Sequence, residues 1–320
     1  MSHELEIVNG EAKMAYVGET PWHGLGTKVS GDLSPRQFQK AAGLDWGVVK
    51  RPSFVTYDGD MIETGTNALL RDTDNAVLAP MVGDGWEPVQ NDEAFDFFGD
   101  FCAAGDMEMH TAGSLKGGEI VWVLAKIKES FDVLGKDRVD NFMLFSNPHQ
   151  YGKSVNVRMT PIRVVCNNTL TMSLGTKSNN EVRMNHRNKF SADLVKEKMG
   201  IASEKFAQYR DMANFLAGKN ANVTDMIKYF NEVFPAKGKD VKVYEDLSPT
   251  AKKTFDFVET QPGGDLAPGT WWNALNAVTY MTDHHLGRTA DTRMQSSWFG
   301  FGAQRKVVAI NTAVKMAEAA

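Results

Sequence analysis

Apolar and polar residues alternate with a period of two through much of the first 165 residues, and a helical period replaces this alternation beyond Ser191. Alternation is typical of strands with one buried face, whereas apolar residues three and four apart form one face of a helix. Residues 48–57 and 61–71 flank Asp58-Gly59, a pair that favours a tight hairpin turn. Residues 76–82 have the composition of a third strand.

Two helices interrupt the strands of this first half. Residues 34–42 predict a short helix that begins with a capping serine and a first-turn proline. A second helix is expected after Asn91, which the pattern predicts as its capping residue. Phe95 and Phe98 fall on one face of this helix, and it is expected to end before Gly105.

A second block of strands follows the second helix. Residues 107–112 and 119–127 flank a glycine pair at 117–118, which predicts two strands joined by a turn. Residues 141–145 and 154–165 add two further strands. These segments together predict one antiparallel sheet.

Beyond residue 191 the pattern indicates helices separated by short loops. Apolar residues fall on one helical face in five segments: residues 206–216, 224–234, 249–259, 270–285 and 303–317. Strands followed by helices predict an α+β fold, with a strand-rich domain at residues 1–190. Residues 191–320 are expected to pack on that domain or to mediate assembly into a homo-oligomer. The apolar bulk of 270–285 suits either a buried core helix or such an interface.

The last strand of the second block has two unlike faces. By alternation, Asn156 and Arg158 lie on a polar face, and Val155 and Val157 lie on an apolar one. Arg163 falls in phase with the apolar residues, so we expect it to point towards a core partner and to be structural.

A run of small polar groups ends this strand. Cys166, Asn167, Asn168 and Thr169 follow two valines. A free cysteine in this setting is most often a small buried residue, so Cys166 is interpreted as structural. Asn167 or Asn168 is expected to cap the segment that follows, and Asn167 is therefore also interpreted as structural.

Charge is unevenly distributed in this chain of 320 residues with a net charge of −5. Residues 1–110 hold 7 Lys and Arg against 19 Asp and Glu, whereas residues 151–190 hold seven bases and a single acid, Glu181. A local basic block in an acidic protein favours anion binding. The alternative is a solvated face that pairs with the acidic N-terminal half.

The basic block combines cations, amides and an aromatic ring, which suits nucleic-acid phosphates and bases. Tyr151 offers a stacking platform for a base. The candidate nucleic-acid-binding residues are Tyr151, Lys153, Asn156, Arg158, Lys177, Arg183, Arg187 and Lys189.

Signatures of catalysis and of metal binding are missing from the sequence. It contains no phosphate-binding loop, no nucleophile elbow and no zinc-protease motif. A catalytic Cys166 would need a histidine base, and the sequence does not show whether His149 or His186 lies near it. His284 and His285 are adjacent, so on a helix they point about 100° apart and make poor joint ligands. We therefore predict that the protein has no cofactor and no metal site, and we favour a function without catalysis over an enzymatic one.

The chain also lacks signals for membranes and secretion. Its apolar runs, such as residues 120–125, are too short to span a bilayer. Its first residues include Glu4 and Glu6 where a signal peptide would be basic and then apolar. These features predict a cytoplasmic protein with no membrane partner.

Several motifs resemble one known family. "GETPWHGLG" (18–26), "AAGLDWGV" (41–48), "EPVQNDEAF" (87–95), "TPIRVVCNNTL" (160–170) and "WWNALNAVTYMTDHH" (271–285) look like the phage- and plasmid-related proteins defined by domain of unknown function 932. In that family the histidine before the basic strand is usually followed by an Asp-Gly-Ser-like turn, and residues 150–154 here are a variation on it.

The resemblance implies DNA processing, recombination or evasion of host defence, since such proteins occur on mobile elements. Phage single-strand annealing proteins share a strand-rich half, a basic groove and helices that pack into rings. The leading hypothesis is therefore an oligomeric single-stranded-DNA-binding protein in the host cytoplasm. One alternative is a module whose acidic N-terminal half binds a host defence protein, and another is an enzyme of unrecognised type.

Overall fold

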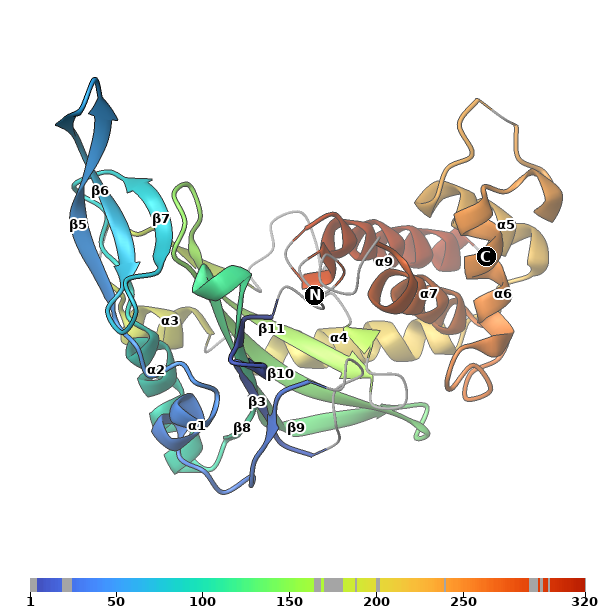
Figure 1. The fold of residues 1–320 in the computed structure, drawn as a ribbon. Coiled ribbons are helices and arrows are strands. Elements are labelled where there is room, and N and C mark those ends of the chain that lie inside the picture. The colour runs from blue at the N-terminus through green and yellow to red at the C-terminus, as the bar shows by residue number, and fades with distance from the viewer. Residues whose placement is uncertain are drawn as a thin grey trace. The chain divides into compact units, whose positions relative to one another are not determined.

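The computed structural model has the α+β architecture that the sequence predicts, with strands concentrated in the first half and helices in the second (Figure 1). It describes residues 5–18, 25–163, 168–169, 181–187, 189–199, 202–238, 240–287, 293, 296–298 and 300–319. Among the predicted site residues, Cys166, Asn167 and Lys177 lie outside these ranges, and only the backbone of Arg163 is described.

The largest sheet of the described residues has eight strands, ordered β12-β11-β10-β9-β8-β3-β4, with β13 also pairing with β11. Its strands are β3 (Met14–Tyr16), β4 (Thr27–Lys28), β8 (Met107–Leu115), β9 (Ile120–Val133), β10 (Asp137–Pro148), β11 (Val155–Arg163), β12 (Asn168–Thr169) and β13 (Glu181–Met184). A short pair, β1 (Ile7–Val8) and β2 (Glu11–Ala12), stands apart from it. The predicted strands at 107–112, 119–127 and 141–145 are confirmed, and each is longer than predicted.

A second sheet contains β5 (Val48–Tyr57), β6 (Asp60–Arg71) and β7 (Val77–Val82) in the order β5-β6-β7. Asp58 and Gly59 form the turn between β5 and β6, with φ angles of 50° and 88°. Two successive positive φ values match the right-handed twist of the strands, and glycine adopts them without strain. The predicted hairpin is confirmed.

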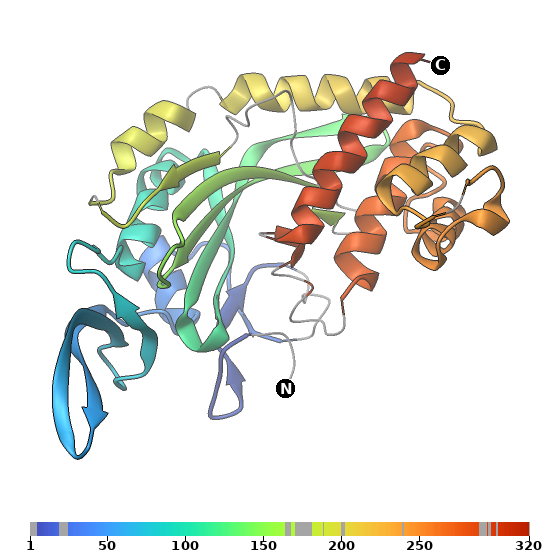
Figure 2. The same cartoon turned by 90° about the horizontal axis from the view of Figure 1, so that it is seen from above.

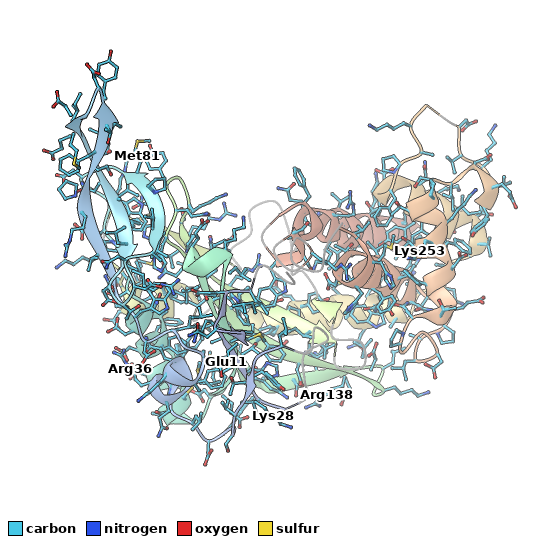
Figure 3. The ribbon with its side chains drawn as sticks, viewed as in Figure 1. Glu11, Lys28, Arg36, Met81, Arg138 and Lys253 are labelled. Carbon is cyan, nitrogen blue, oxygen red and sulfur yellow. The ribbon has the colours of Figure 1, made fainter. Side chains whose placement is uncertain are left out.

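Helices α1 (Pro35–Ala41) and α2 (Asn91–Ala104) contact each other and β8. Ser34 caps α1 and accepts a hydrogen bond from the backbone N–H of Gln37, as predicted. Arg36 of α1, which Figure 3 labels, forms ion pairs with Asp92 and Asp96 of α2.

The predicted cap of α2 is wrong. The capping residue is Gln90, and Asn91 lies inside the helix with its side chain buried. The Asn91 amide instead donates to the carbonyl oxygens of Leu44 and Trp46. The carbonyl of Leu44 also accepts from the side-chain amide of Gln39 at 3.1 Å, so Asn91 belongs to a buried hydrogen-bond network instead of a helix cap.

The second half contains α3 (Ala192–Met199), α4 (Ala202–Ala217), α5 (Val223–Val233), α6 (Pro249–Thr260), α7 (Trp271–Tyr280) and α9 (Phe301–Ala319). Short turns are η1 (Lys116–Gly118), η2 (Tyr244–Asp246) and η3 (Met281–His285), the last of which is a π-helical turn. Figure 2 shows α9 running beside α7, which it contacts. The predicted helices are confirmed.

Helix α7 is buried along almost its whole length. Trp271 and Trp272 have no exposed surface, and the N–H of Trp272 donates to Asp137 Oδ2 at 2.9 Å. Its apolar bulk is therefore used in a core, and assembly into a homo-oligomer stays a prediction.

Two compact units divide the chain, and both are discontinuous in sequence. Unit 1 comprises residues 1–128, 142–158 and 181–200, and unit 2 comprises residues 129–141, 159–180 and 201–320. Phenylalanines of α2 and Phe145 form much of the core of unit 1. Tyr229, Phe230 and Trp271 form part of the core of unit 2. A boundary near residue 190 between independently folding domains stays a prediction.

Within the described residues, none of the helices combines the length and apolar character that crossing a bilayer requires.

Candidate nucleic-acid interface

The antiparallel pairing of β11 with β13 brings two basic segments together that are far apart in the sequence. Asn156 lies opposite Arg183, and Arg158 lies opposite Glu181. Directly opposed residues point to the same face of a sheet. The polar face predicted for the strand at 154–165 is thereby confirmed and extended, because Val155 and Val157 are buried while Asn156 and Arg158 are half-buried.

The same pairing places two turns at one end of these strands. Val155 at the start of β11 lies opposite Met184 at the end of β13. The segment before β11 and the segment after β13 therefore meet at this end of the sheet. We call the resulting set the basic surface, made of Tyr151, Lys153, Asn156, Arg158, Arg183, Arg187 and Lys189. All seven residues belong to unit 1.

Two of the arginines are occupied by protein contacts. Arg183 is exposed and forms an ion pair with Glu181 at 2.8 Å, and the hydrogen bond to Glu181 raises its pKa. Burial lowers the pKa of Arg158 to about 10, which the attraction of Glu181 opposes. Arg158 thus remains charged at neutral pH, but its side chain is only partly available to a ligand.

The other cations of the basic surface are open to solvent. Lys153, Arg187 and Lys189 are exposed, and no carboxylate of the described residues lies within ion-pair distance of them. Tyr151 beside them is 69% exposed. An exposed aromatic ring among unpaired cations is the combination that single-stranded nucleic acids use for stacking and phosphate contacts.

A buried histidine anchors the segment that carries Arg187 and Lys189. His186 is 2% exposed and stacks on Trp86, with ring centroids 4.0 Å apart. Its Nδ1 donates to the carbonyl of Glu87 at 3.1 Å, and the Glu87 N–H donates to the carbonyl of His186 at 2.5 Å. Burial lowers the pKa of His186, so the ring is neutral at neutral pH.

A second buried histidine anchors the turn that carries Tyr151 and Lys153. His149 has no exposed surface, and its Nε2 donates to Asn91 Oδ1 at 3.2 Å. Its backbone N–H donates to the carbonyl of Glu119 at 2.7 Å. Burial, together with the charges of His186 and Arg71, lowers the pKa of His149 to about 3. A neutral ring that donates from Nε2 carries only a lone pair on Nδ1, which leaves no buried N–H without a partner.

Asn147 completes this framework with an N–H of its amide that donates to the carbonyl of Val89 at 2.8 Å. The motif at 87–95 thus contacts residues 147–149 through Asn91 and Val89, and residue 186 through Glu87. The sequence indicated the exposed residues but not these supports. A polar residue inside a buried segment, such as Asn147 or His149, was the signal that could have identified them.

The remaining predicted residues have different outcomes. Asn156 is half-buried and its amide donates to the carbonyl of Ser154 at 2.8 Å, so part of its hydrogen-bonding capacity is used locally. Asn168 lies in β12 opposite Arg163 of β11. The segment that Asn168 would cap lies outside the described residues, so the capping role stays a prediction. The structure does not describe the side chains of four predicted residues, so their roles stay predictions: Arg163, Cys166, Asn167 and Lys177.

No group of three or more histidine, cysteine, aspartate or glutamate side chains in the described residues is arranged to hold a metal ion. His285 instead packs against Phe257, with ring centroids 4.5 Å apart, and His284 packs against Tyr280.

Comparison with known proteins identifies one family. The model of a domain of unknown function (DUF932) matches residues 80–306, which is more than two thirds of the chain. No curated protein and no solved structure matches. The matched range includes the whole basic surface and both buried histidines.

Proposed function

Because the chain belongs to the DUF932 family, and because the matched residues 80–306 include the basic surface, we propose that it is a single-stranded-DNA-binding protein of the annealing type. It is encoded by a phage or plasmid and acts in the host cytoplasm, in recombination, without a chemical step of its own. The resemblance to proteins of mobile elements supports this role.

One observation carries the proposal. Lys153 and Arg187 lie in segments that meet at one end of paired strands, beside the exposed ring of Tyr151, and among the described residues no carboxylate pairs with either cation. Solvated faces of proteins usually mix charges of both signs. A set of five cations with Glu181 as its single acid, fixed by buried histidines, suits a polyanion.

The residues of the surface have distinct tasks in this function. Lys153, Arg187 and Lys189 neutralise phosphates and release counterions, and Tyr151 stacks on a base. Arg183 reaches a phosphate only by sharing its charge with Glu181. Phosphate contacts and stacking both ignore base identity, so the binding is independent of sequence.

A salt titration tests the proposal. Three exposed cations on a single strand, at about 0.7 per phosphate, give a slope of roughly −2 in log affinity against log salt. Lys153→Ala should weaken binding to all sequences and make the slope shallower by about 0.7. Arg158→Ala should change the slope less and lower stability, because it removes a half-buried group from Glu181. Fluorescence anisotropy with labelled oligonucleotides measures both effects.

Lys40→Ala is the matched control, since Lys40 is an exposed lysine of unit 1 outside the basic surface. It should leave affinity and slope unchanged. Absence of binding at low salt, or equal slopes for the wild type and Lys153→Ala, would exclude the basic surface as the binding site. A strand-annealing assay with complementary oligonucleotides then separates annealing from binding alone.

The second candidate is a module that binds another protein through the acidic N-terminal half. It is favoured by large apolar side chains exposed on β5 and β6, among them Tyr57 and Met61. A protein that ignores DNA, remains monomeric and captures one host defence protein would support this candidate over the first.

A further inference from the structure

Strands β5 and β6 extend past the third strand of their sheet as a two-stranded ribbon (Figure 1). Strand β7 pairs with β6 only at residues 67–70, whereas β5 and β6 pair with each other as far as Tyr57 and Asp60. We call residues 53–64 the arm. A ribbon of two strands has no third layer that could bury its side chains.

The arm is apolar on both of its faces. Val55 lies opposite Ile62, so these two share one face, and Thr56 lies opposite Met61 on the other. Tyr57 is 74% exposed and Met61 71%, and Phe54 is 49% exposed. Side chains project from both sides of the ribbon (Figure 3).

Exposed large apolar side chains are more frequent on this sheet than on the other described surfaces. Seven of the fifteen large apolar residues exposed in the described chain lie on β5, β6 and β7, which make up about a tenth of its length. Single exposed apolar residues are ordinary, but a contiguous patch marks a surface that another molecule covers.

The end of β6 opposite the hairpin turn is held by contacts to the rest of unit 1. Arg71 at the end of β6 forms an ion pair with Glu6 at 2.6 Å and donates to the carbonyl of Gly117 at 2.6 Å. Its guanidinium lies over the ring of Trp46, 4.6 Å from the centroid. The arm is thus anchored to unit 1 at one end and exposed at the other.

The charges of the arm restrict what can cover it. Asp58, Asp60 and Glu63 lie on the arm, and residues 52–70 contain no lysine or arginine. Acidic groups repel a nucleic acid. Two arms packed together would also bring like charges close. The complement of the arm is therefore a basic surface that includes an exposed apolar or aromatic group.

We propose that the arm of one copy docks on the basic surface of a second copy of this chain. Lys153, Arg187 and Lys189 face the arm's carboxylates, and the ring of Tyr151 meets its apolar side chains. The contact joins two different patches, so it is heterologous and links copies head to tail. The arm and single-stranded DNA then compete for one surface, which goes beyond the proposed function and couples DNA binding to disassembly.

Charge reversal tests the contact. An arm variant carries Asp60→Lys and Glu63→Lys, and a surface variant carries Lys153→Glu and Arg187→Glu. All four residues are exposed, so the folds should persist, which circular dichroism checks. Mass photometry and sedimentation velocity should show head-to-tail assembly of the wild type and monomers of each variant alone. An equimolar mixture of the two variants should assemble again, because each arm then meets a surface of opposite charge.

A matched control carries Lys28→Glu and Lys40→Glu, which change the net charge as the surface variant does but lie elsewhere in unit 1. This control should assemble like the wild type. A wild type that stays monomeric, or a mixture that stays monomeric, would overturn the proposal. Assembly by the surface variant alone would assign the contact to arms packed on arms.

Adding single-stranded DNA to the wild type should dissociate the assemblies. The double variant Tyr57→Ser with Met61→Ser should raise the apparent affinity for DNA several-fold, because it weakens the arm that competes with DNA for the basic surface. Persistence of DNA-bound assemblies held by the arm would refute the competition. If DNA fails to bind at all while the variant mixture assembles, the proposed function fails and the arm contact stands.

Discussion

At the scale of single residues, two buried histidines have a task that their chemistry makes dependent on pH. His149 and His186 hold the turns beneath the basic surface, and both are neutral because burial lowers their pKa. Neutral imidazole can donate one hydrogen bond without a charge to solvate, which suits a buried support. The side-chain partners of the two rings among the described residues are the neutral oxygens of Asn91 and of the Glu87 backbone, so a protonated ring would lack a compensating carboxylate there.

We expect this arrangement to make the protein sensitive to acid. In the unfolded chain histidine takes up a proton near pH 6.5, whereas folded His149 does so only near pH 3. The unfolded state therefore binds more protons between these values, so stability is complete above pH 6.5 and falls as the pH drops towards 3. The lowering of the His149 pKa from 6.5 to about 3 corresponds to a loss of at most about 5 kcal/mol in the free energy of unfolding.

His149→Gln should flatten this dependence, because an amide can keep the hydrogen bond to Asn91 without titrating. Urea unfolding of the wild type and of His149→Gln is measured at about evenly spaced values, pH 7.5, 6.5, 5.5 and 4.5. The slopes of the free energy of unfolding against pH are then compared. Equal losses of stability between pH 6.5 and 4.5 would contradict the assigned role of His149.

At the scale of elements, a buried ion pair ties α9 to the π-helical turn η3. Lys306 Nζ lies 2.8 Å from Asp283 Oδ1 and 2.9 Å from Ser297 Oγ, and Ser297 also donates to Asp283. Lys306 is 2% exposed and Asp283 9%. A charge buried at such depth needs its partner, so the two elements must keep this contact.

Removal of one partner should therefore be costly. Lys306→Met should lower the free energy of unfolding by about 3–5 kcal/mol, since it removes the cation that compensates the buried charge of Asp283. Lys306→Met combined with Asp283→Leu should recover part of this loss, because no buried charge remains. Urea titrations measure both changes, and a loss below about 1 kcal/mol for the single change would show that the pair is not structurally required.

Elements with local signals were predictable from the sequence, and elements that depend on distant partners were not. Asp58-Gly59 specified its hairpin because the turn needs positive φ at both positions. Strand β13 is four residues long and exists because β11 offers it an edge, which no local pattern records. Asn91 was misassigned as a cap because its partners are backbone carbonyls more than forty residues away in sequence.

The candidate site divides in the same way. Its cations were visible in the composition of residues 151–190, but the meeting of Lys153 with Arg187 depends on strand register. The exposed arm was missed because alternation predicts a strand with one buried face, and a bare ribbon has none.

At the scale of the whole molecule, the chain passes from one unit to the other five times, at residues 128, 141, 158, 180 and 200. The boundaries fall inside β9, β10 and β11, so single strands contribute to both units. Neither unit is a continuous piece of sequence that a cut could release.

We expect the two units to unfold in one transition, since strands shared between them couple their stabilities. Calorimetry should give equal calorimetric and van't Hoff enthalpies, and Lys306→Met in unit 2 should shift the whole transition. Val157→Ala, a core change in unit 1, should do the same. Two separable transitions, with only one moved by each substitution, would show that the units are independent.

The same chain path sets the order in which the protein can fold as it is synthesised. Unit 1 needs residues as late as 181–200, among them β13 and His186, while unit 2 begins to be made at residue 129. When the arm leaves the ribosome, the segment that completes the basic surface is still more than a hundred residues away. Each nascent chain therefore exposes its arm before it carries the complete surface on which we propose that an arm docks.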